Sequence, residues 1–306
     1  MNLQRSNFKT VFALTALYIG WGSTYMAIAV ALEYFPPFLL SGIRFIIAGL
    51  VFLFWSLLQG QTLPKIKELL QICFIGLFLL FLGSGSVVWV EQYLSTGLTS
   101  IVWASLPIWL VAMDKKRWSY YRSNKKLMMG LLVGFLGVIL LFGDDEFIHS
   151  IDPKSLVAYS VAFFGVICFA FGSLKSQQGS FQSNIILIVA IQMLCVGLLS
   201  MVISFLLDEK FVPHTTQSGL EALYGLIYLI VVGSLIAYFS YVWLLKVLPP
   251  SIVGTYTYIN PAIAILLGWW FLRETVSIQK VLALLLIFIG VAFINYYKSK
   301  NINENV

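Results

Sequence analysis

The feature that most constrains this chain is a succession of apolar runs, each about twenty residues long, separated by short polar or Pro/Gly-containing loops. A helix rises 1.5 Å per residue, so about twenty residues cross the ~30 Å hydrocarbon core of a bilayer. Only 10% of the 306 residues are charged and the mean hydropathy is +0.92, too little polar surface for a water-soluble globule. We predict an all-α integral membrane protein with ten transmembrane helices, at residues 10–32, 37–58, 69–94, 97–113, 127–143, 154–174, 184–207, 220–244, 251–271 and 278–297.

The basic residues are distributed unevenly among the predicted loops. If the amino terminus is cytoplasmic, fourteen of the nineteen Lys and Arg residues fall on that side, from Arg5 to Lys300. Cytoplasmic loops of membrane proteins carry such an excess. The net charge of +6 is therefore explained by topology, without a nucleic-acid partner, and both termini are predicted to be cytoplasmic.

The cysteine and histidine residues give no sign of a metal or cofactor site. Cys73, Cys168 and Cys195 lie in apolar runs without paired spacing, where a small buried hydrophobic role is expected. His149 and His214 fall in predicted outer loops and form no ligand cluster. The P-loop pattern for ATP does not occur in the sequence either. We expect no disulfide, metal, cofactor or intrinsic ATP site.

The two halves of the chain, residues 1–150 and 151–306, show a weak internal repeat. Each half holds five predicted spans, an odd number, so the second half must cross the membrane in the opposite direction. Inverted repeats of this kind build many secondary transporters, whose site lies near the bilayer midplane between the halves. A shift of about 150 residues aligns Trp21-Gly22-Ser23 with Phe171-Gly172-Ser173, and it aligns Gly83-Ser84 with Gly233-Ser234. When the shift is increased by four residues, Ser105-Leu106-Pro107 aligns with Ile259-Asn260-Pro261.

Pro107 and Pro261 lie near the middle of the fourth and ninth predicted spans. Proline removes a backbone donor and frees a carbonyl one turn earlier, and an unpaired group in hydrocarbon costs several kcal/mol. We expect Ser105 and Asn260 to line or repair these breaks. The alternative is an ordinary kink that improves packing, but recurrence in both halves favours a hinge or a cavity wall.

Several motifs occur in order along nearly the whole chain. They are WGSTY at 21–25, PPFLLSGIRFIIAG at 36–49, GSG at 83–85, YTYINPAIAILLG at 256–268 and RETVS at 273–277. With these motifs the sequence resembles the ten-helix EamA branch of the drug/metabolite transporter superfamily. The resemblance implies two inverted five-helix repeats and a multi-pass carrier of the bacterial cytoplasmic membrane, often an exporter of amino acids or related compounds. Arg273 departs from the family pattern, in which glycine usually precedes the glutamate.

Arg44 is a charged residue inside a predicted span. A charged side chain at this depth usually faces a cavity or a charged partner. One interpretation is a forked donor to a substrate carboxylate or phosphate. The other is a structural ion pair with Glu91, near the end of the third span, which a snorkelling arginine would reach. We expect the ion pair first, and a pair lining the cavity would satisfy both interpretations.

Polar and aromatic stripes at helical spacing supply the other candidate cavity residues. Tryptophan and tyrosine deep in a span can stack on a flat or cationic substrate, although a single such ring near a boundary is better explained by the interfacial belt. The predicted cavity set is Trp21, Tyr25, Arg44, Ser84, Glu91, Trp103, Ser234, Tyr238, Tyr241, Tyr256 and Asn260.

Gly130, Gly134 and Gly137 give the fifth span a small-residue face on which a neighbouring helix can pack closely. Whether such a face forms a homodimer interface is open at this point. The other expected partners are the lipid bilayer and a small-molecule substrate.

Together these observations predict a secondary transporter that exports an amino acid or related metabolite by alternating access. A flippase for a lipid-linked substrate is an alternative. A membrane-embedded enzyme is disfavoured because the deep positions offer hydroxyls, amides and aromatic rings without a general base. Glu91 is the one titrating group available for proton coupling, so facilitation or exchange is an equal expectation.

Overall fold

The computed structural model describes residues 2–142, 152–211, 216–263 and 278–304, which form helices joined by short turns and loops, with no strand among them. The predicted all-α membrane fold is confirmed. In the first half the helices are α1 (Asn2–Leu32), α2 (Pro37–Leu58), α3 (Ile66–Gly76), η1 (Leu77–Ser84), α4 (Gly85–Val90), α5 (Thr96–Trp103), α6 (Leu106–Met113), η2 (Lys115–Arg117), α7 (Trp118–Ser123) and α8 (Lys125–Phe142). In the second half they are α10 (Pro153–Gln178), α11 (Ile185–Leu206), α12 (Thr216–Tyr228), η3 (Leu229–Tyr238), α13 (Phe239–Val247), α14 (Pro250–Val253), a helical stretch at 256–263 and α16 (Ile278–Glu304).

Six helical segments in the described ranges are long and apolar enough to cross a bilayer, namely 8–32, 37–58, 66–90, 153–178, 185–206 and 219–247. A seventh candidate is bent by 96° between residues 115–123 and 125–140, and shorter apolar helices cover 98–113 and 281–294. The ninth predicted span, 251–271, lies partly outside the described residues. The number of crossings therefore stays a prediction.

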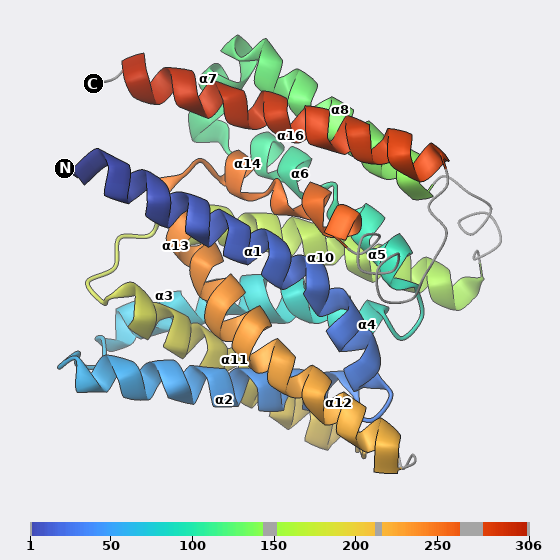
Figure 1. Cartoon of the computed structure of the whole chain (residues 1–306). Helices are drawn as coiled ribbons and strands as arrows, with labels where there is room; N and C mark the ends of the chain where they lie inside the picture. The colour runs from blue at the N-terminus through green and yellow to red at the C-terminus, as the bar shows by residue number, and fades with distance from the viewer. Residues whose placement is uncertain (1, 143–151, 212–215, 264–277, 305–306) are drawn as a thin grey trace.

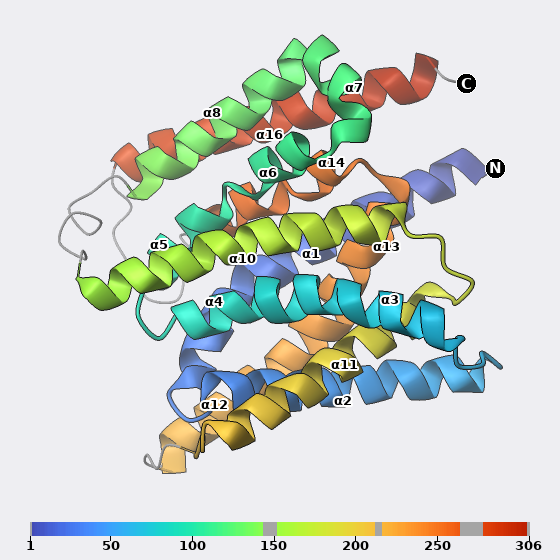
Figure 2. The ribbon, with the colours of Figure 1, turned by 180° about the vertical axis from the view of Figure 1, so that it is seen from behind.

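The helices of one half pack mainly against helices of the other half. In the first half, α1 packs on α12, η3 and α13, while α2 packs on α11. The segments η1 and α4 pack on α10, α6 on α14, and α8 on α16. Figures 1 and 2 show α8 and α16 side by side at one edge of the bundle and α2 and α11 at the opposite edge.

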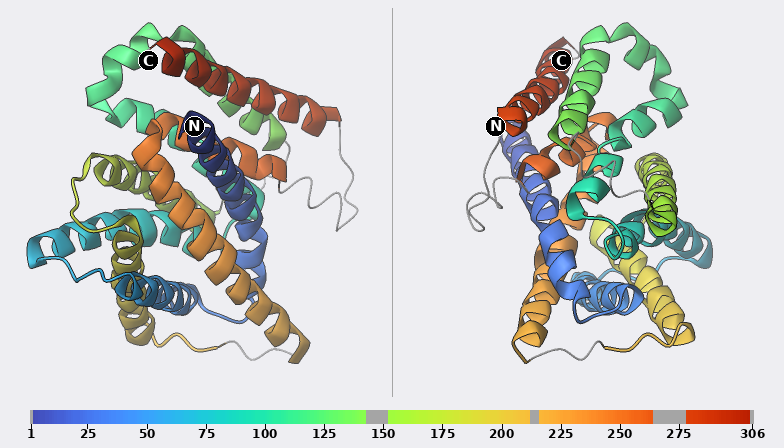
Figure 3. Two further views of the ribbon diagram at one scale, coloured as in Figure 1. Left: turned by 60° about the vertical axis from the view of Figure 1, so that its left-hand side comes forward. Right: turned by 90° about the vertical axis from the view of Figure 1, so that its right-hand side faces the viewer.

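The beginning of α1 and the end of α16 lie at the same end of the bundle, which we call the terminal end (Figures 1 and 2). The connections at 59–65, 114–124 and 179–184 lie at this end as well. Figures 1 and 2 show the long helices running between the terminal end and the opposite end, and Figure 3 shows the bundle from two further directions. Most basic residues that we assigned to one side of the membrane are in these connections or beside them.

Two π-helical segments lie in the middle of long helices, one in each half. They are η1 between α3 and α4, and η3 between α12 and α13. Each contains one of the Gly-Ser pairs that the internal repeat aligns, Gly83-Ser84 and Gly233-Ser234. Inserted π-turns often mark functional sites, because they redirect side chains within a helix.

The fourth predicted span is broken at Ala104 and Ser105, directly before Pro107 in the first turn of α6. Ser105 Oγ donates to the carbonyl of Val102, within this break, over 2.6 Å.

In the second half the corresponding turn falls at residues 254–255, where Thr255 Oγ1 donates to the Ile252 carbonyl over 2.7 Å. Thr255, at a constant shift of 150 residues, is thus the counterpart of Ser105. Asn260 does not repair this break, and Pro261 lies within the helical stretch 256–263.

The glycine face of α8 packs against α16, as the small-residue spacing predicts. A Cβ atom added to Gly290 would lie 2.5 Å from the Gly134 backbone nitrogen, and one on Gly137 would lie 2.8 Å from the Ile287 nitrogen. Tyr258 packs on Gly134 from the other side. The glycine face of α8 therefore packs against another helix of the same chain.

Candidate functional site

A cavity of about 40 Å³ lies between the two halves near the middle of the long helices. This volume holds only a few water molecules, so a metabolite needs a wider conformation to enter. The first half contributes residues of α1, α2, η1, α4 and α5, and the second half contributes α10 and the stretch 256–263. The lining residues are Trp21, Thr24, Tyr25, Ile28, Arg44, Ser84, Val87, Trp103, Phe169, Tyr256 and Asn260.

Most of the predicted cavity residues lie on this wall, but four do not. Ser234, Tyr238 and Tyr241 lie behind it and support it, whereas Glu91 lies at the end of α4. The sequence reasoning missed Thr24, Ile28, Val87 and Phe169. Thr24 belongs to the same WGSTY motif as Trp21, so a signal for it was present.

Arg44 is almost completely buried, with 5% of its surface exposed. Its Nε donates a hydrogen bond to Ser234 Oγ over 2.8 Å, and its Cζ lies 5.0 Å from the centre of the Phe45 ring. A Cβ on Gly233 would meet Arg44 Nη2 at 2.7 Å, so the guanidinium in this position packs directly against Gly233. Arg44 lines the cavity, and with Nε held by Ser234 its two Nη groups are the donors left for a ligand.

The expected ion pair between Arg44 and Glu91 is wrong. Both carboxyl oxygens of Glu91 are buried and have no hydrogen-bond partner in the part of the chain that the structure describes. The guanidinium turns instead toward η3, which packs on α2. Glu91 is the residue at the C-terminal cap of α4.

An aromatic cluster forms one side of the cavity around Trp21. The Trp21 ring lies 4.8 Å from Tyr256, 5.1 Å from Tyr241 and 6.0 Å from Phe169, measured between ring centres. Trp21 Nε1 donates to the carbonyl of Gly233 in η3 over 3.1 Å, which fixes the indole ring. These rings from both halves are tilted or edge-on to one another, and they give the cavity an aromatic side against which a substrate can pack.

Two of the predicted tyrosines support this cluster from behind. The Tyr238 hydroxyl donates to Gln192 Oε1 on α11 over 2.8 Å. The Tyr241 hydroxyl is hydrogen-bonded to Ser173 Oγ on α10. Their hydroxyl groups are therefore engaged with protein, and their rings act on the cavity through Trp21.

Two buried polar atoms at the cavity have no partner among the described residues. They are Trp103 Nε1, a donor, and Asn260 Oδ1, an acceptor. Buried polar groups in proteins nearly always have a hydrogen-bond partner. Unpaired polar atoms in a binding cavity therefore indicate positions at which a ligand supplies the partner.

Within the described ranges, no three His, Cys, Asp or Glu side chains gather into a group that would hold a metal ion. The polar groups around the cavity are a guanidinium, hydroxyls, an amide and an indole N–H. This arrangement is suited to binding a small organic molecule with charged and flat parts.

A membrane-embedded bundle of paired halves with a central aromatic and polar cavity is the architecture of a membrane carrier. The sequence profile of the EamA-like transporter family matches residues 8–143 and again residues 156–296, so the chain belongs to this family.

Relatives and a solved structure agree with this family membership. The chain is 34% identical over 287 residues to the uncharacterized inner membrane transporter YedA of Escherichia coli K12, covering 94% of this chain and 90% of YedA. It is 24% identical to protein PecM of Dickeya dadantii, over 88% of this chain and 86% of PecM. One crystal structure superposes with a TM-score of 0.72 at 19% identity, covering 94% of this chain and 98% of the other, and shows the same fold.

Proposed function

We propose that this protein is a secondary transporter that exports an amino acid or a related small metabolite across the bacterial cytoplasmic membrane by alternating access. The location follows the similarity to YedA, which is named as an inner membrane transporter. The excess of Lys and Arg at the terminal end favours cytoplasmic termini.

The observation that carries the proposal is the set of groups that converge on the cavity. Arg44 presents donors for a carboxylate, and Trp103 Nε1 adds another donor. Asn260 Oδ1 offers an acceptor for an ammonium or amide N–H, and the rings around Trp21 give a surface for an apolar or aromatic part. A zwitterion with a flat or apolar side chain complements all of these groups.

The small volume of the cavity favours alternating access over a permanent channel. At about 40 Å³ the site is too small for a whole metabolite, so we propose that transport requires the halves to separate. The break before Pro107 gives α5 and α6 a flexible joint, and we propose Pro107 and Pro261 as hinges.

An exchange assay tests the proposal directly. Purified protein in liposomes loaded with an unlabelled amino acid should accumulate the same labelled amino acid from outside, and Arg44→Lys should reduce this accumulation. The matched control is Arg122→Ala, which removes an exposed basic residue far from the cavity. Accumulation that is equal for wild type, Arg44→Lys and protein-free liposomes would contradict the proposal, and movement of a lipid-linked substrate instead would favour a flippase.

A further inference from the structure

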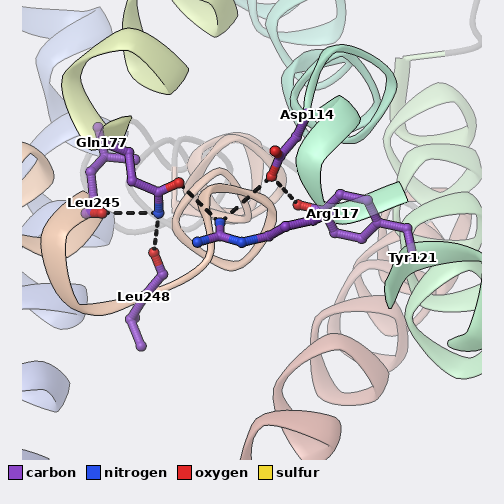
Figure 4. A network of polar contacts seen from close by, with 6 residues as sticks. All are labelled: Asp114, Arg117, Tyr121, Gln177, Leu245 and Leu248. Carbon is purple, nitrogen blue, oxygen red and sulfur yellow. Dashed lines mark hydrogen bonds and ion pairs between the residues drawn. The ribbon is translucent and has the colours of Figure 1, made fainter. Parts of the chain in front are cut away.

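A network of polar contacts lies at the terminal end of the bundle, where α6, α10 and α13 come together (Figure 4). Arg117 Nη1 donates to Gln177 Oε1 over 2.9 Å and lies 3.6 Å from Asp114 Oδ2. The Tyr121 hydroxyl donates to the same Asp114 oxygen over 2.9 Å. The network joins the segment after α6 in the first half to α10 in the second half.

Gln177 also binds the end of α13. Its Nε2 donates to the carbonyls of Leu245 and Leu248, each over 3.0 Å. These carbonyls lie in the last turn of α13 and just after it, where backbone acceptors have no partner within the helix. Lys246 Nζ adds a second connection by donating to the Ser176 carbonyl over 2.8 Å. The ends of α10 and α13 are thus fastened together.

One face of α10 links this network to the cavity. Phe169, Ser173 and Gln177 are spaced four residues apart and therefore follow one another along the same face of the helix. Phe169 lines the cavity, Ser173 binds the hydroxyl of Tyr241, and Gln177 belongs to the network. Along α10, these three residues therefore follow one another from the cavity to the network at the terminal end.

The acidic member of the network is held firmly. Only 2% of the Asp114 side chain is exposed, whereas 38% of the Arg117 side chain is exposed. A buried carboxylate with a tyrosine donor and an arginine beside it is a fixed anchor, and the partly exposed arginine is the part that can detach.

We infer that Asp114, Arg117, Tyr121 and Gln177 form the latch of a gate that closes the cavity toward the terminal end. The latch lies across the two halves, so separation of the halves at this end breaks the bond between Arg117 and Gln177. This inference rests on the proposed transport function, because a gate has a role only where the cavity opens alternately to the two sides.

The test measures access to the cavity and requires no substrate. Ser84→Cys places a thiol on the cavity wall in a chain whose native Cys73, Cys168 and Cys195 are replaced by serine or alanine. A membrane-impermeant thiol reagent is added to vesicles on the side that the termini face, as established by protease cleavage of a terminal tag. The rate of labelling of the cysteine reports how often the gate is open.

Arg117→Ala is expected to raise this labelling rate about tenfold, because the latch loses its charge-assisted hydrogen bond. Gln177→Ala should have a similar effect, and Arg117→Lys a smaller one. The matched control is Arg122→Ala, which removes one positive charge from the same segment, where Arg122 lies over the Trp118 ring and takes no part in the network. This control should leave the rate unchanged.

An equal labelling rate in Arg117→Ala, Arg122→Ala and the parent chain would overturn the inference. A lower melting temperature of Arg117→Ala without faster labelling would also overturn it, because this result indicates a structural contact only. If Arg117→Ala does not fold, Arg117→Lys and Gln177→Ala provide the same comparison. Faster labelling in a protein that shows no exchange in liposomes would support the gate and contradict the proposed transport, so the two failures are distinguishable.

Discussion

Arg44 Nε and Ser234 Oγ are joined by a 2.8 Å hydrogen bond that connects α2 of the first half to η3 of the second half. A buried guanidinium that lines the cavity is therefore fixed by protein at its Nε. The same π-helical segment supplies Gly233, whose carbonyl fixes the Trp21 ring and whose lack of a side chain makes room for the guanidinium. Charge and aromatic surface in the site thus depend on one irregular helical segment.

Replacement of Arg44 separates its charge from its geometry. Arg44→Lys keeps the charge but loses the planar fork, so we expect binding of carboxylate ligands to weaken about tenfold or more. Arg44→Ala should weaken it further. The measurement is the dissociation constant for an amino acid, with melting temperature as the test of folding. Unchanged affinity in folded Arg44→Lys and Arg44→Ala variants would show that the arginine does not contact the ligand.

Ser234→Ala tests whether the serine positions Arg44. The charge remains, but Nε loses its acceptor and the guanidinium is free to turn, so we expect affinity for carboxylates to fall by a factor of about two to ten. Ser160→Ala is a suitable control, because Ser160 is exposed and binds only a carbonyl of its own helix. An effect of equal size in both variants would contradict a positioning role.

Gly290→Ala should destabilise the packing of α8 on α16. The added methyl group would lie 2.5 Å from the Gly134 nitrogen and 2.7 Å from the Gly130 carbonyl, and backbone atoms cannot move aside as a side chain can. Overpacking of this kind costs about 1–3 kcal/mol. The melting temperature in detergent should fall, whereas Gly219→Ala, whose nearest neighbour would be 3.7 Å away, should leave it nearly unchanged.

The start of α10 should make stability depend on pH. Asp152 caps this helix by accepting the backbone N–H of Ser155 over 2.6 Å, and this bond holds the pKa of Asp152 below its ordinary range. A lowered pKa in the folded state gives stability that is complete above the unfolded value of about 3.9 and is lost as the pH falls through the folded value.

Asp152→Asn, which keeps a capping oxygen without a titrating group, should remove this part of the acid dependence. Melting temperatures measured between pH 3 and 6 compare the two proteins. Identical acid dependence in both would show that the cap does not contribute.

Much of the fold follows from the sequence because membrane burial imposes one simple pattern. Apolar runs of spanning length predict the helices, and the Gly-Ser pairs at 83–84 and 233–234 mark both π-helical segments. Neither pair reveals by itself that the helix widens there. That change depends on what packs on the segment, as when the Phe169 side chain takes the space beside Gly83.

The partner of Arg44 was not predictable from depth along the helix alone. Arg44 and Glu91 both lie toward the same end of their predicted spans, and this suggested a pair. The packing of α2 on η3 puts Ser234 within reach instead, while the Glu91 carboxyl has no hydrogen-bond partner among the described residues. Phe169 was missed for a similar reason, because an isolated phenylalanine in an apolar run looks the same whether it faces lipid or a cavity.

The central claim is that Arg44 binds the carboxylate of a small zwitterionic ligand in the cavity between the halves. The most direct measurement is the thermal shift of wild type and Arg44→Gln with amino acids and with the matching amino-acid amides, which lack the carboxylate. A ligand at 100 times its dissociation constant adds about 2.7 kcal/mol of stability. The account predicts that an amino acid stabilises only the wild type and that its amide stabilises neither protein. Equal stabilisation of wild type and a folded Arg44→Gln variant by an amino acid would contradict it.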